Sequence, residues 1–302
     1  MLEDNNKISA PLKNLSPIAF VMLSLAVVFV SYQILGGFLN AVILKGDISG
    51  TNQNITLERI IVSFSQFMFI LVIVIILNIL RGDSFENGFK FKKSKTSYLA
   101  LGFVGMIVVQ PLLQYILVLQ NKILFSLPFG QDSINSIKSL YDYFESYTQK
   151  LVASSNIGEF IFVVFVIALT PAICEEFMFR GLILSNLEKL KGAKIPIIFT
   201  GILFAIFHFH PFNIIPLLIL GIFISYIAYY SESIFPAILI HFLNNFMSAL
   251  AVYILGNDSI DDKAVSWLEL LKYTPFALIS LGVFIYILIL VKKIYEQGKK
   301  VE

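Results

Sequence analysis

Long, nearly uncharged apolar blocks dominate the chain, without the alternation of apolar and polar positions that soluble strands or amphipathic helices show. At a rise of about 1.5 Å per residue, a helix of about 20 apolar residues crosses the hydrocarbon core of a bilayer. The pattern therefore predicts an all-α fold, a polytopic membrane helical bundle of about eight transmembrane helices. The expected segments lie near 17–44, 58–80, 97–119, 156–180, 195–209, 213–230, 234–255 and 273–292.

The bundle is expected to be one integrated unit with three parts along the chain. Residues 1–155 supply N-terminal membrane helices and a long extracytoplasmic connection, 156–255 a core that carries the polar motifs, and 256–302 a last transmembrane helix with a basic tail. The connection, 120–155, is itself periodic, with apolar residues at three- and four-residue spacing: Ile134, Ile137, Tyr141 and Phe144. Such a helix lies at the membrane interface or packs on the bundle, and the sequence leaves both open.

The composition supports a membrane protein and argues against a nucleic-acid partner. The chain is 57% hydrophobic and 14% charged, with a mean hydropathy of +0.83, whereas soluble domains are about 25% charged. The net charge of +2 comes without a basic stripe, so no nucleic-acid partner is expected. The lipid bilayer is the expected surrounding, and the abundance of Ile, Phe, Asn and Lys is typical of an AT-rich bacterial genome. Nothing in the sequence indicates an oligomeric state.

The distribution of basic residues predicts the orientation of the bundle. With both termini placed inside, 15 of the 22 lysines and arginines fall on the cytoplasmic side. An excess of lysine and arginine in cytoplasmic loops is the general rule for membrane proteins. The sequence therefore predicts a protein of the bacterial cell membrane with both termini in the cytoplasm.

Three ionisable residues interrupt the segment near 156–180. Glu175, Glu176 and Arg180 lie where charge costs about 2.5–3.5 kcal/mol per residue on insertion scales. Glu176 and Arg180, four residues apart, share a helix face and can form an ion pair, whereas Glu175 is rotated roughly 100° away, toward a possible cavity. Pro171 cannot donate a hydrogen bond to the carbonyl of Ile167, which loosens the helix one turn earlier. A charged helix end that reaches the cytoplasm is the alternative interpretation.

Polar residues on two further segments favour a shared site. His208 ends one apolar segment, while His241 and Asn245 project from one face of another at i, i+4 spacing. A lone membrane histidine is often an interhelical hydrogen-bond partner, but two of them with an asparagine and a glutamate pair favour a functional site. His210, just before Pro211, is expected to be an interface residue.

These residues can hydrolyse an amide. Glu175, made more basic by a low-dielectric site and by Glu176, suits a general base, and His208 could orient the same water. His241 and Asn245 could donate hydrogen bonds to the oxyanion that develops on the scissile carbonyl. Glu175, His208 and His241 could instead hold a divalent metal such as zinc. The residues leave open whether a metal is required or no cofactor at all.

The three motifs in order, Glu175-Glu176-x-x-x-Arg180, Phe204-x-x-x-His208 and His241-x-x-x-Asn245, resemble those of the CAAX-processing and bacteriocin-processing (CPBP, or Abi) family of intramembrane peptidases. The resemblance covers roughly 155–255, and the eight expected spans also resemble the prenyl-protein endopeptidase branch. It implies an endopeptidase, often described as a metalloprotease, that acts on a peptide or membrane-protein substrate. It also implies water activation by Glu175 and His208, and oxyanion stabilisation by His241 and Asn245.

Other classes of intramembrane protease fit the sequence poorly. The sequence has no His-Glu-x-x-His, no aspartate within an expected span and no Gly-x-Ser-x-Gly. Cys174, the only cysteine, is a rival nucleophile, although a small packing residue is the simpler interpretation. A non-enzymatic membrane protein stays open as well, either a proton-coupled transporter or a peptide-binding immunity protein. Two similar halves, common in transporters, are not evident.

Overall fold

The computed structural model describes residues 10–44, 55–126, 130–190, 192–256 and 266–300, and this described part is helical throughout, without a strand. Several long helices, called rods below, consist of α-helical stretches joined by a wide π-helical turn, marked η. The elements are α1 Pro17–Phe29, η1 Val30–Gly36, α2 Gly37–Ile43, α3 Ile55–Gln66, η2 Phe67–Val72, α4 Ile73–Arg81, α5 Phe85–Gly88, α6 Thr96–Ser126, α7 Gln131–Val152, α8 Ile157–Val163, η3 Val164–Leu169, α9 Thr170–Glu176, η4 Phe177–Ile183, α10 Leu184–Leu187, α11 Lys194–Phe207, the single 3₁₀ turn η5 Pro211–Asn213, α12 Ile214–Ser231, α13 Phe235–Leu255 and α14 Trp267–Lys299.

These elements form rods that are long and apolar enough to cross a membrane. Seven meet that description among the described residues, and α11, at 14 residues, is a shorter apolar helix. The predicted all-helical bundle of about eight spans is therefore confirmed, and the chain is an integral membrane protein. The last rod runs over Trp267–Lys299 rather than the expected 273–292, because its polar ends extend the helix beyond the apolar stretch that hydropathy detects.

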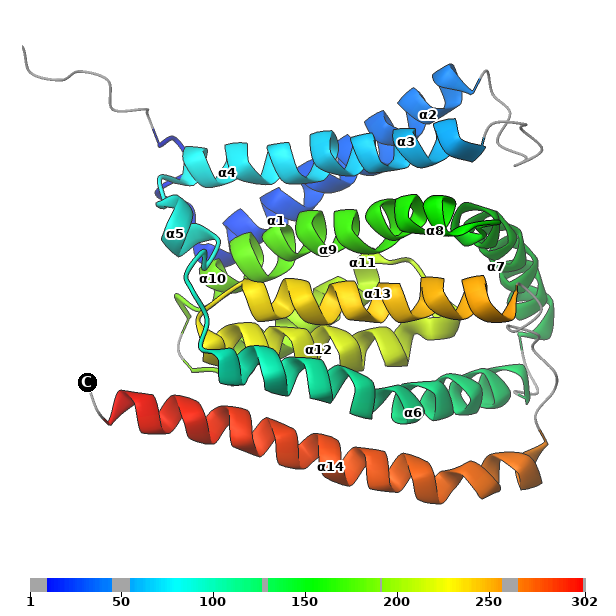
Figure 1. Cartoon of the computed structure of the whole chain (residues 1–302). Coiled ribbons are helices and arrows are strands. Elements are labelled where there is room, and N and C mark those ends of the chain that lie inside the picture. Colours follow the sequence, from blue (N-terminus) through cyan, green and yellow to red (C-terminus); the bar gives the residue numbers. More distant parts are fainter. Residues whose placement is uncertain (1–9, 45–54, 127–129, 191, 257–265, 301–302) are drawn as a thin grey trace, which may run out of the picture.

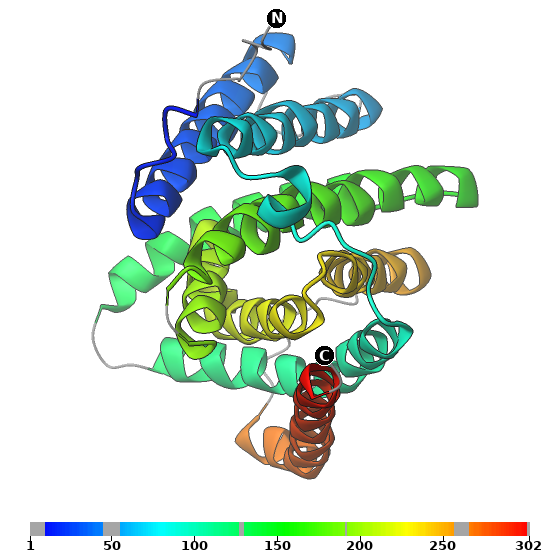
Figure 2. The ribbon, with the colours of Figure 1, turned by 90° about the vertical axis from the view of Figure 1, so that its left-hand side faces the viewer.

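The rods lie roughly along one direction in three layers (Figure 1). The hairpin from α1 to α4 forms one outer layer, α6 and α14 form the other, and α8 to α13 lie between them. Viewed from one end, the middle layer surrounds the centre of the bundle (Figure 2). This layer contains the helices that carry Glu175 and Glu176, His208, and His241.

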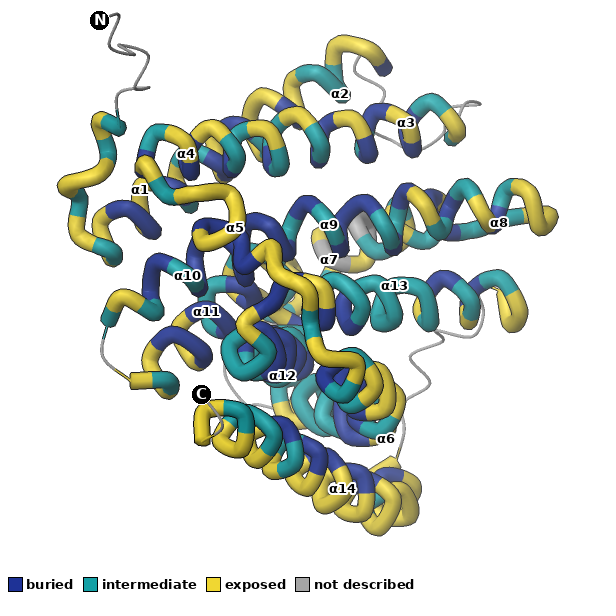
Figure 3. The backbone as a smooth tube through the Cα atoms, turned by 60° about the vertical axis from the view of Figure 1, so that its left-hand side comes forward, coloured by how far each residue is buried: buried dark blue, intermediate teal, exposed yellow. Residues whose placement is uncertain are grey.

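The outer surface of the bundle is apolar. On α14 the side chains of Leu268, Phe276 and Ile279 are 70%, 65% and 66% exposed, and exposed positions follow the outer faces of α14 and of the α1–α4 layer (Figure 3). Exposed apolar area of this extent fits contact with lipid chains rather than with water.

The connection 120–155 is largely helical. α6 continues to Ser126, and α7 then runs across the ends of the rods (Figure 1). Ile137 and Leu140 of α7 are exposed, as an interfacial helix requires, whereas the side chains of Tyr141 and Phe144 lie outside the described part. The end of α7 is held by Arg59, which pairs with Glu159 at 2.7 Å and donates to the carbonyls of Leu151, at 2.9 Å, and Ala153.

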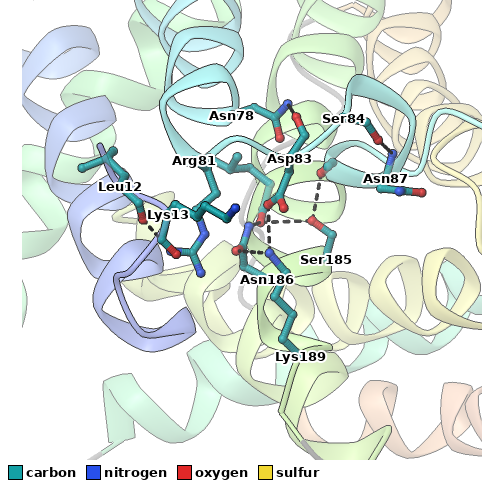
Figure 4. Close-up of polar contacts among 12 residues, drawn as sticks. Leu12, Lys13, Asn78, Arg81, Asp83, Ser84, Asn87, Ser185, Asn186 and Lys189 are labelled. Carbon is teal, nitrogen blue, oxygen red and sulfur yellow. Dashed lines mark hydrogen bonds and ion pairs between the residues drawn. The ribbon is translucent and has the colours of Figure 1, made fainter. Parts of the chain in front are cut away.

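The opposite end of the bundle, where α1 begins and α14 ends, is tied together by polar contacts (Figure 4). Arg81, at the end of α4, donates to the carbonyls of Leu12 and Leu15 at 2.6 and 2.7 Å. Lys189, just after α10, pairs with Asp83 at 2.8 Å. The outer hairpin is thus fixed to the middle layer at both ends, which holds its polar residues in place against α9.

Candidate active site

The rod that carries the glutamates is irregular where they lie. α9, Thr170–Glu176, is flanked by the wide turns η3, Val164–Leu169, and η4, Phe177–Ile183. Pro171 has no N–H to give to the carbonyl of Ile167. Wide turns inside α-helices are frequent at functional sites, and here they bracket the only two adjacent glutamates of the chain.

Glu176 is the centre of a fully buried network. Its Oε1 accepts a hydrogen bond from Nη1 of Arg180 at 2.6 Å and lies 2.7 Å from Nδ1 of His241. The Glu176 and Arg180 side chains are 0% exposed and that of His241 is 4% exposed. The expected Glu176–Arg180 ion pair is therefore present. The contact with His241, on a rod 65 residues further along the chain, joins the first motif to the third.

The other two nitrogens of Arg180 also donate hydrogen bonds. Nη2 donates to the carbonyl of Gly221 at 3.0 Å, and Nε donates to Oγ of Ser225 at 3.3 Å. The guanidinium lies over the ring of Phe204, 4.5 Å from its centroid. A buried charge is tolerated when it is paired and hydrogen-bonded, and Arg180 is paired with Glu176 and donates from all three of its nitrogens.

Glu175, in contrast, is partly accessible and loosely held. Its side chain is 18% exposed, and Nε2 of His208 lies 3.7 Å from its Oε2, beyond hydrogen-bond distance. Among the described residues Oε2 has no hydrogen-bond partner although it is buried. Nδ1 of His208 lies 2.7 Å from the carbonyl of Phe204, so it donates there and leaves Nε2 directed at Glu175.

His241 and Asn245 lie on the same face of α13, as their spacing predicts. Nδ2 of Asn245 donates to the carbonyl of Ile167 at 3.2 Å, and Oδ1 of Asn245 accepts from Asn244 at 3.1 Å. The carbonyl that Pro171 leaves without its helical partner is therefore satisfied from a neighbouring rod. An amide nitrogen carries two hydrogens, so one hydrogen of Nδ2 remains for another acceptor.

The structure thus brings five of the six candidate residues into two contact groups, Glu175 with His208 and Glu176 with Arg180 and His241, and binds Asn245 to the rod of the glutamates. Sequence reasoning missed the Glu176–His241 contact and the roles of Ser225 and Gly221. A signal existed for the first, because a glutamate in an apolar span needs every available partner. The backbone carbonyl of Gly221 leaves no signal in a sequence.

The zinc alternative asks for at least three protein ligands. Within the described ranges no three His, Cys, Asp or Glu side chains gather as a metal-binding group. Nδ1 of His241 is already engaged by Glu176. The residues thus do not form a ready ligand set, and the mechanism proposed below includes no step through a metal.

Neither Cys174 nor His210 belongs to the two contact groups. Cys174 is 0% exposed and packs in the core between the rods, which fits a packing residue. His210 precedes the turn η5, and burial lowers the pKa of its imidazole.

A polar cleft of about 410 Å³ contains none of the six candidate residues. Within its lining Lys90 pairs with Glu188 at 2.7 Å. Burial raises the pKa of the Glu188 carboxyl, and the charge of Lys90 opposes that rise. The lining residues are Glu86, Asn87, Lys90, Lys92, Ser185, Glu188, Lys189, Tyr229, Glu232 and Tyr295.

Comparison with known families identifies the middle layer. Residues 157–247 match the family model described as type II CAAX prenyl endopeptidase Rce1-like. Residues 157–247 are an Rce1-like domain. The Rce1-like domain begins at the first residue of α8, ends within α13 and contains all six candidate residues. Comparison with curated proteins and with solved structures gives no match.

The Rce1-like domain indicates intramembrane protease activity and a peptide substrate in the membrane. The family resemblance expected from the three motifs is confirmed. The described part outside this domain comprises α1 to α7 and the last part of the chain, including α14.

Proposed function

We propose that the protein is an intramembrane endopeptidase that hydrolyses a peptide bond at or near the membrane, with Glu175 as general base and with His241 and Asn245 as oxyanion donors. The observation that carries the proposal is the contrast between adjacent glutamates. Glu176 is completely buried and its Oε1 is held by Arg180 and His241 at 2.6 and 2.7 Å, whereas Glu175 is partly accessible and its partner His208 lies 3.7 Å away.

Water activation is assigned to Glu175 and His208. A water that lies beside the pair and contacts both Oε2 of Glu175 and Nε2 of His208, which are 3.7 Å apart, gives a proton to Glu175 as its oxygen attacks the scissile carbonyl carbon. General-base catalysis of this kind contributes about 10²–10⁴-fold to a rate. The hydrogen bond from Nδ1 of His208 to the Phe204 carbonyl fixes the ring for this task.

Stabilisation of the tetrahedral intermediate is assigned to α13. With Nδ1–H of His241 on Glu176, donation to the oxyanion requires a second N–H, at Nε2, so that His241 acts as an imidazolium. Arg180 and imidazolium His241 then carry two positive charges against the one negative charge of Glu176, and the oxyanion restores the balance. The second hydrogen of Asn245 Nδ2 completes a hole with two donors.

Collapse of the intermediate breaks the carbon–nitrogen bond. The proton held by Glu175 passes to the leaving nitrogen, which departs as an amine, and the new carboxylic acid loses its own proton to solvent. The reaction consumes one water and returns Glu175 to its carboxylate form. No redox partner is needed.

A cleavage assay tests the proposal. Purified protein in nanodiscs is given a farnesylated, fluorogenic Cys-aliphatic-aliphatic-X peptide and the same peptide without the lipid, beside Glu175→Gln. Cleavage by the wild type and not by Glu175→Gln is the expected result, and the pair of peptides shows whether a prenyl group is required. Peptide binding without cleavage would instead favour the peptide-binding immunity protein, and neither binding nor cleavage would favour the transporter.

Metal dependence is tested on the same preparation. Activity that persists after a chelator wash, with less than one zinc per ten chains, supports the mechanism above. One tightly held zinc per chain, with activity lost on stripping and regained on zinc addition, would replace it with a metal-assisted mechanism.

The orientation with both termini in the cytoplasm is also part of the proposal. The start of α1 and the end of α14 lie toward the same end of the bundle (Figure 1). Reporter fusions at Lys90 and Lys299 should both read cytoplasmic, and a fusion near residue 143 should not. Different sides for Lys90 and Lys299 would contradict this topology.

A further inference from the structure

The N-terminal hairpin presents polar side chains to the glutamate rod. Ser63 and Gln66 of α3 are 7% and 8% exposed, although the rod as a whole is apolar. Oγ of Ser63 lies 3.1 Å from Oγ1 of Thr170, the first residue of α9. Gln66 follows Ser63 at i, i+3 and so lies one turn along the same face. This face is therefore directed at α9.

Tyr32, on the other rod of the hairpin, links Gln66 to the proposed base. The hydroxyl of Tyr32 shares a hydrogen bond with Gln66, and the carboxylate of Glu175 lies close enough to interact with it electrostatically. Tyr32 belongs to the wide turn η1, which packs against η2, the continuation of the rod that carries Gln66. The hairpin thus forms a wall of the site that is separate from the Rce1-like domain.

This wall contains an acceptor without a donor. Oε1 of Gln66 is buried and has no hydrogen-bond partner among the described residues, and the same holds for Oε2 of Glu175 and Oε2 of Glu176. A buried acceptor left without a donor costs about 1–3 kcal/mol, so each oxygen needs an N–H or O–H from outside the described contacts. For Glu175 the hydrolytic water meets this need. Gln66 requires a second donor.

A peptide substrate brings such donors, because every residue except proline carries a backbone N–H. A chain drawn into an apolar site must have those groups satisfied, since unsatisfied backbone is costly away from water. Gln66 offers a matched acceptor near the base, with its amide held in place by Tyr32.

We propose that Gln66 and Tyr32 form a subsite that binds a main-chain amide of the substrate close to the scissile bond. Oε1 of Gln66 accepts the substrate N–H, and Tyr32 is a positioning residue that fixes the Gln66 amide. The subsite rests on the proposed peptidase function and extends it to the N-terminal helices, outside 157–247. It recognises the peptide backbone rather than a particular side chain.

The test measures binding in a protein that does not cleave. The affinity of the farnesylated peptide is measured with Glu175→Gln and with Glu175→Gln combined with Gln66→Met, which keeps the length of the side chain and removes its acceptor. We expect about tenfold weaker binding, which corresponds to one hydrogen bond between buried groups. Glu175→Gln combined with Tyr32→Phe should bind the peptide about threefold more weakly than Glu175→Gln alone. Ser63→Ala, one turn away on the same face, is the matched control and should change affinity less than twofold.

Methylation of the peptide backbone identifies the partner of Gln66. N-methylation of one residue beside the scissile bond should weaken binding about tenfold to the protein with Gln66 and less than twofold to the protein with Gln66→Met. If Gln66→Met does not fold, Gln66→Asn, which withdraws the amide by one methylene, replaces it with the same expected direction.

Two results would overturn the subsite. The first is the same peptide affinity for Glu175→Gln and for Glu175→Gln combined with Gln66→Met, or no measurable binding to either variant. The second is a loss with Ser63→Ala that matches the loss with Gln66→Met. Cleavage by Glu175→Gln would instead refute the assignment of the base, and it would leave the affinity comparison to decide the subsite.

Discussion

Glu175 and Glu176 are adjacent in the chain, but they differ in burial and in how closely other side chains approach them. Around Glu176, Arg180 and His241 approach to 2.6 and 2.7 Å, and the three side chains are almost completely buried. Around Glu175, the contact with His208 is 3.7 Å and both side chains are partly accessible. The first region has the geometry of a fixed support, and the second is more loosely held and partly accessible.

The difference shows how a membrane helix can hold two acids for two purposes. A carboxylate that is completely buried against an arginine and a histidine is stabilised there and is shielded from a substrate. A neighbour rotated by about 100° can face a wet cavity and exchange protons. The predictions below test whether this division of roles is real.

Glu175→Gln should have the largest effect on activity. The change keeps the volume and removes the base, so turnover should drop by about 10²–10⁴-fold. The thermal unfolding midpoint in detergent should stay within a few degrees of the wild type, because Glu175 makes few contacts. Cleavage rates at saturating peptide provide the measurement, and a fully active variant would show that the two glutamates have been assigned the wrong way round.

Glu176→Gln should act on stability instead. Removing one partner of a buried ion pair costs about 3–5 kcal/mol, and here both Arg180 and His241 lose a charged acceptor. We expect low expression and a markedly lower unfolding midpoint. Unfolding is compared with that of Glu175→Gln, which changes the same functional group one residue away. Equal midpoints for the two variants would remove the structural half of the comparison.

Asn245→Ala should be intermediate between these two. Loss of one oxyanion donor lowers turnover by about 10²–10³-fold, while the affinity for peptide should change little. The Ile167 carbonyl also loses its partner, so a small drop in the unfolding midpoint should accompany the loss of activity. Ser248→Ala, which removes a hydroxyl on the same helix bonded only to the local backbone, is the control.

Cys174→Ala should have the smallest effect. The thiol is fully buried in the core, so cleavage should stay within about twofold of the wild type and should be insensitive to thiol alkylation. Loss of activity that Cys174→Ser does not restore would favour a cysteine nucleophile and would assign Glu175 a lesser role.

Much of this molecule could be predicted from its sequence, for two physical reasons. A bilayer rejects charge and unpaired backbone, so the apolar blocks are almost forced to be helices. The same cost makes Glu175, Glu176 and Arg180 conspicuous. Helical periodicity then predicted that Glu176 faces Arg180, which the 2.6 Å contact confirms. The order of the motifs predicted a family resemblance over roughly 155–255, and the family model matches 157–247.

Contacts between rods could not be predicted in the same way. Periodicity gives the face on which a residue lies but not the rod opposite that face. Hence the contact of His241 with Glu176, and that of Gln66 with Tyr32, were not foreseen. The proline at 171 was expected to loosen its helix, but the sequence gave no indication that Asn245 would satisfy the freed carbonyl of Ile167. The roles of the six candidate residues in catalysis stay predictions.

The hydrogen bond between Asn245 and Ile167 has a mechanical consequence. Together with the contact of His241 with Glu176, it fastens α13 to the glutamate rod at two points, one turn apart on α13 and about nine residues apart on the other rod. Two rods joined at two such points can neither slide past one another nor roll without breaking a joint. A thicker or thinner bilayer must therefore tilt the pair as one body. The spacing between the base and the oxyanion donors should then be the same in membranes of different lipid chain length.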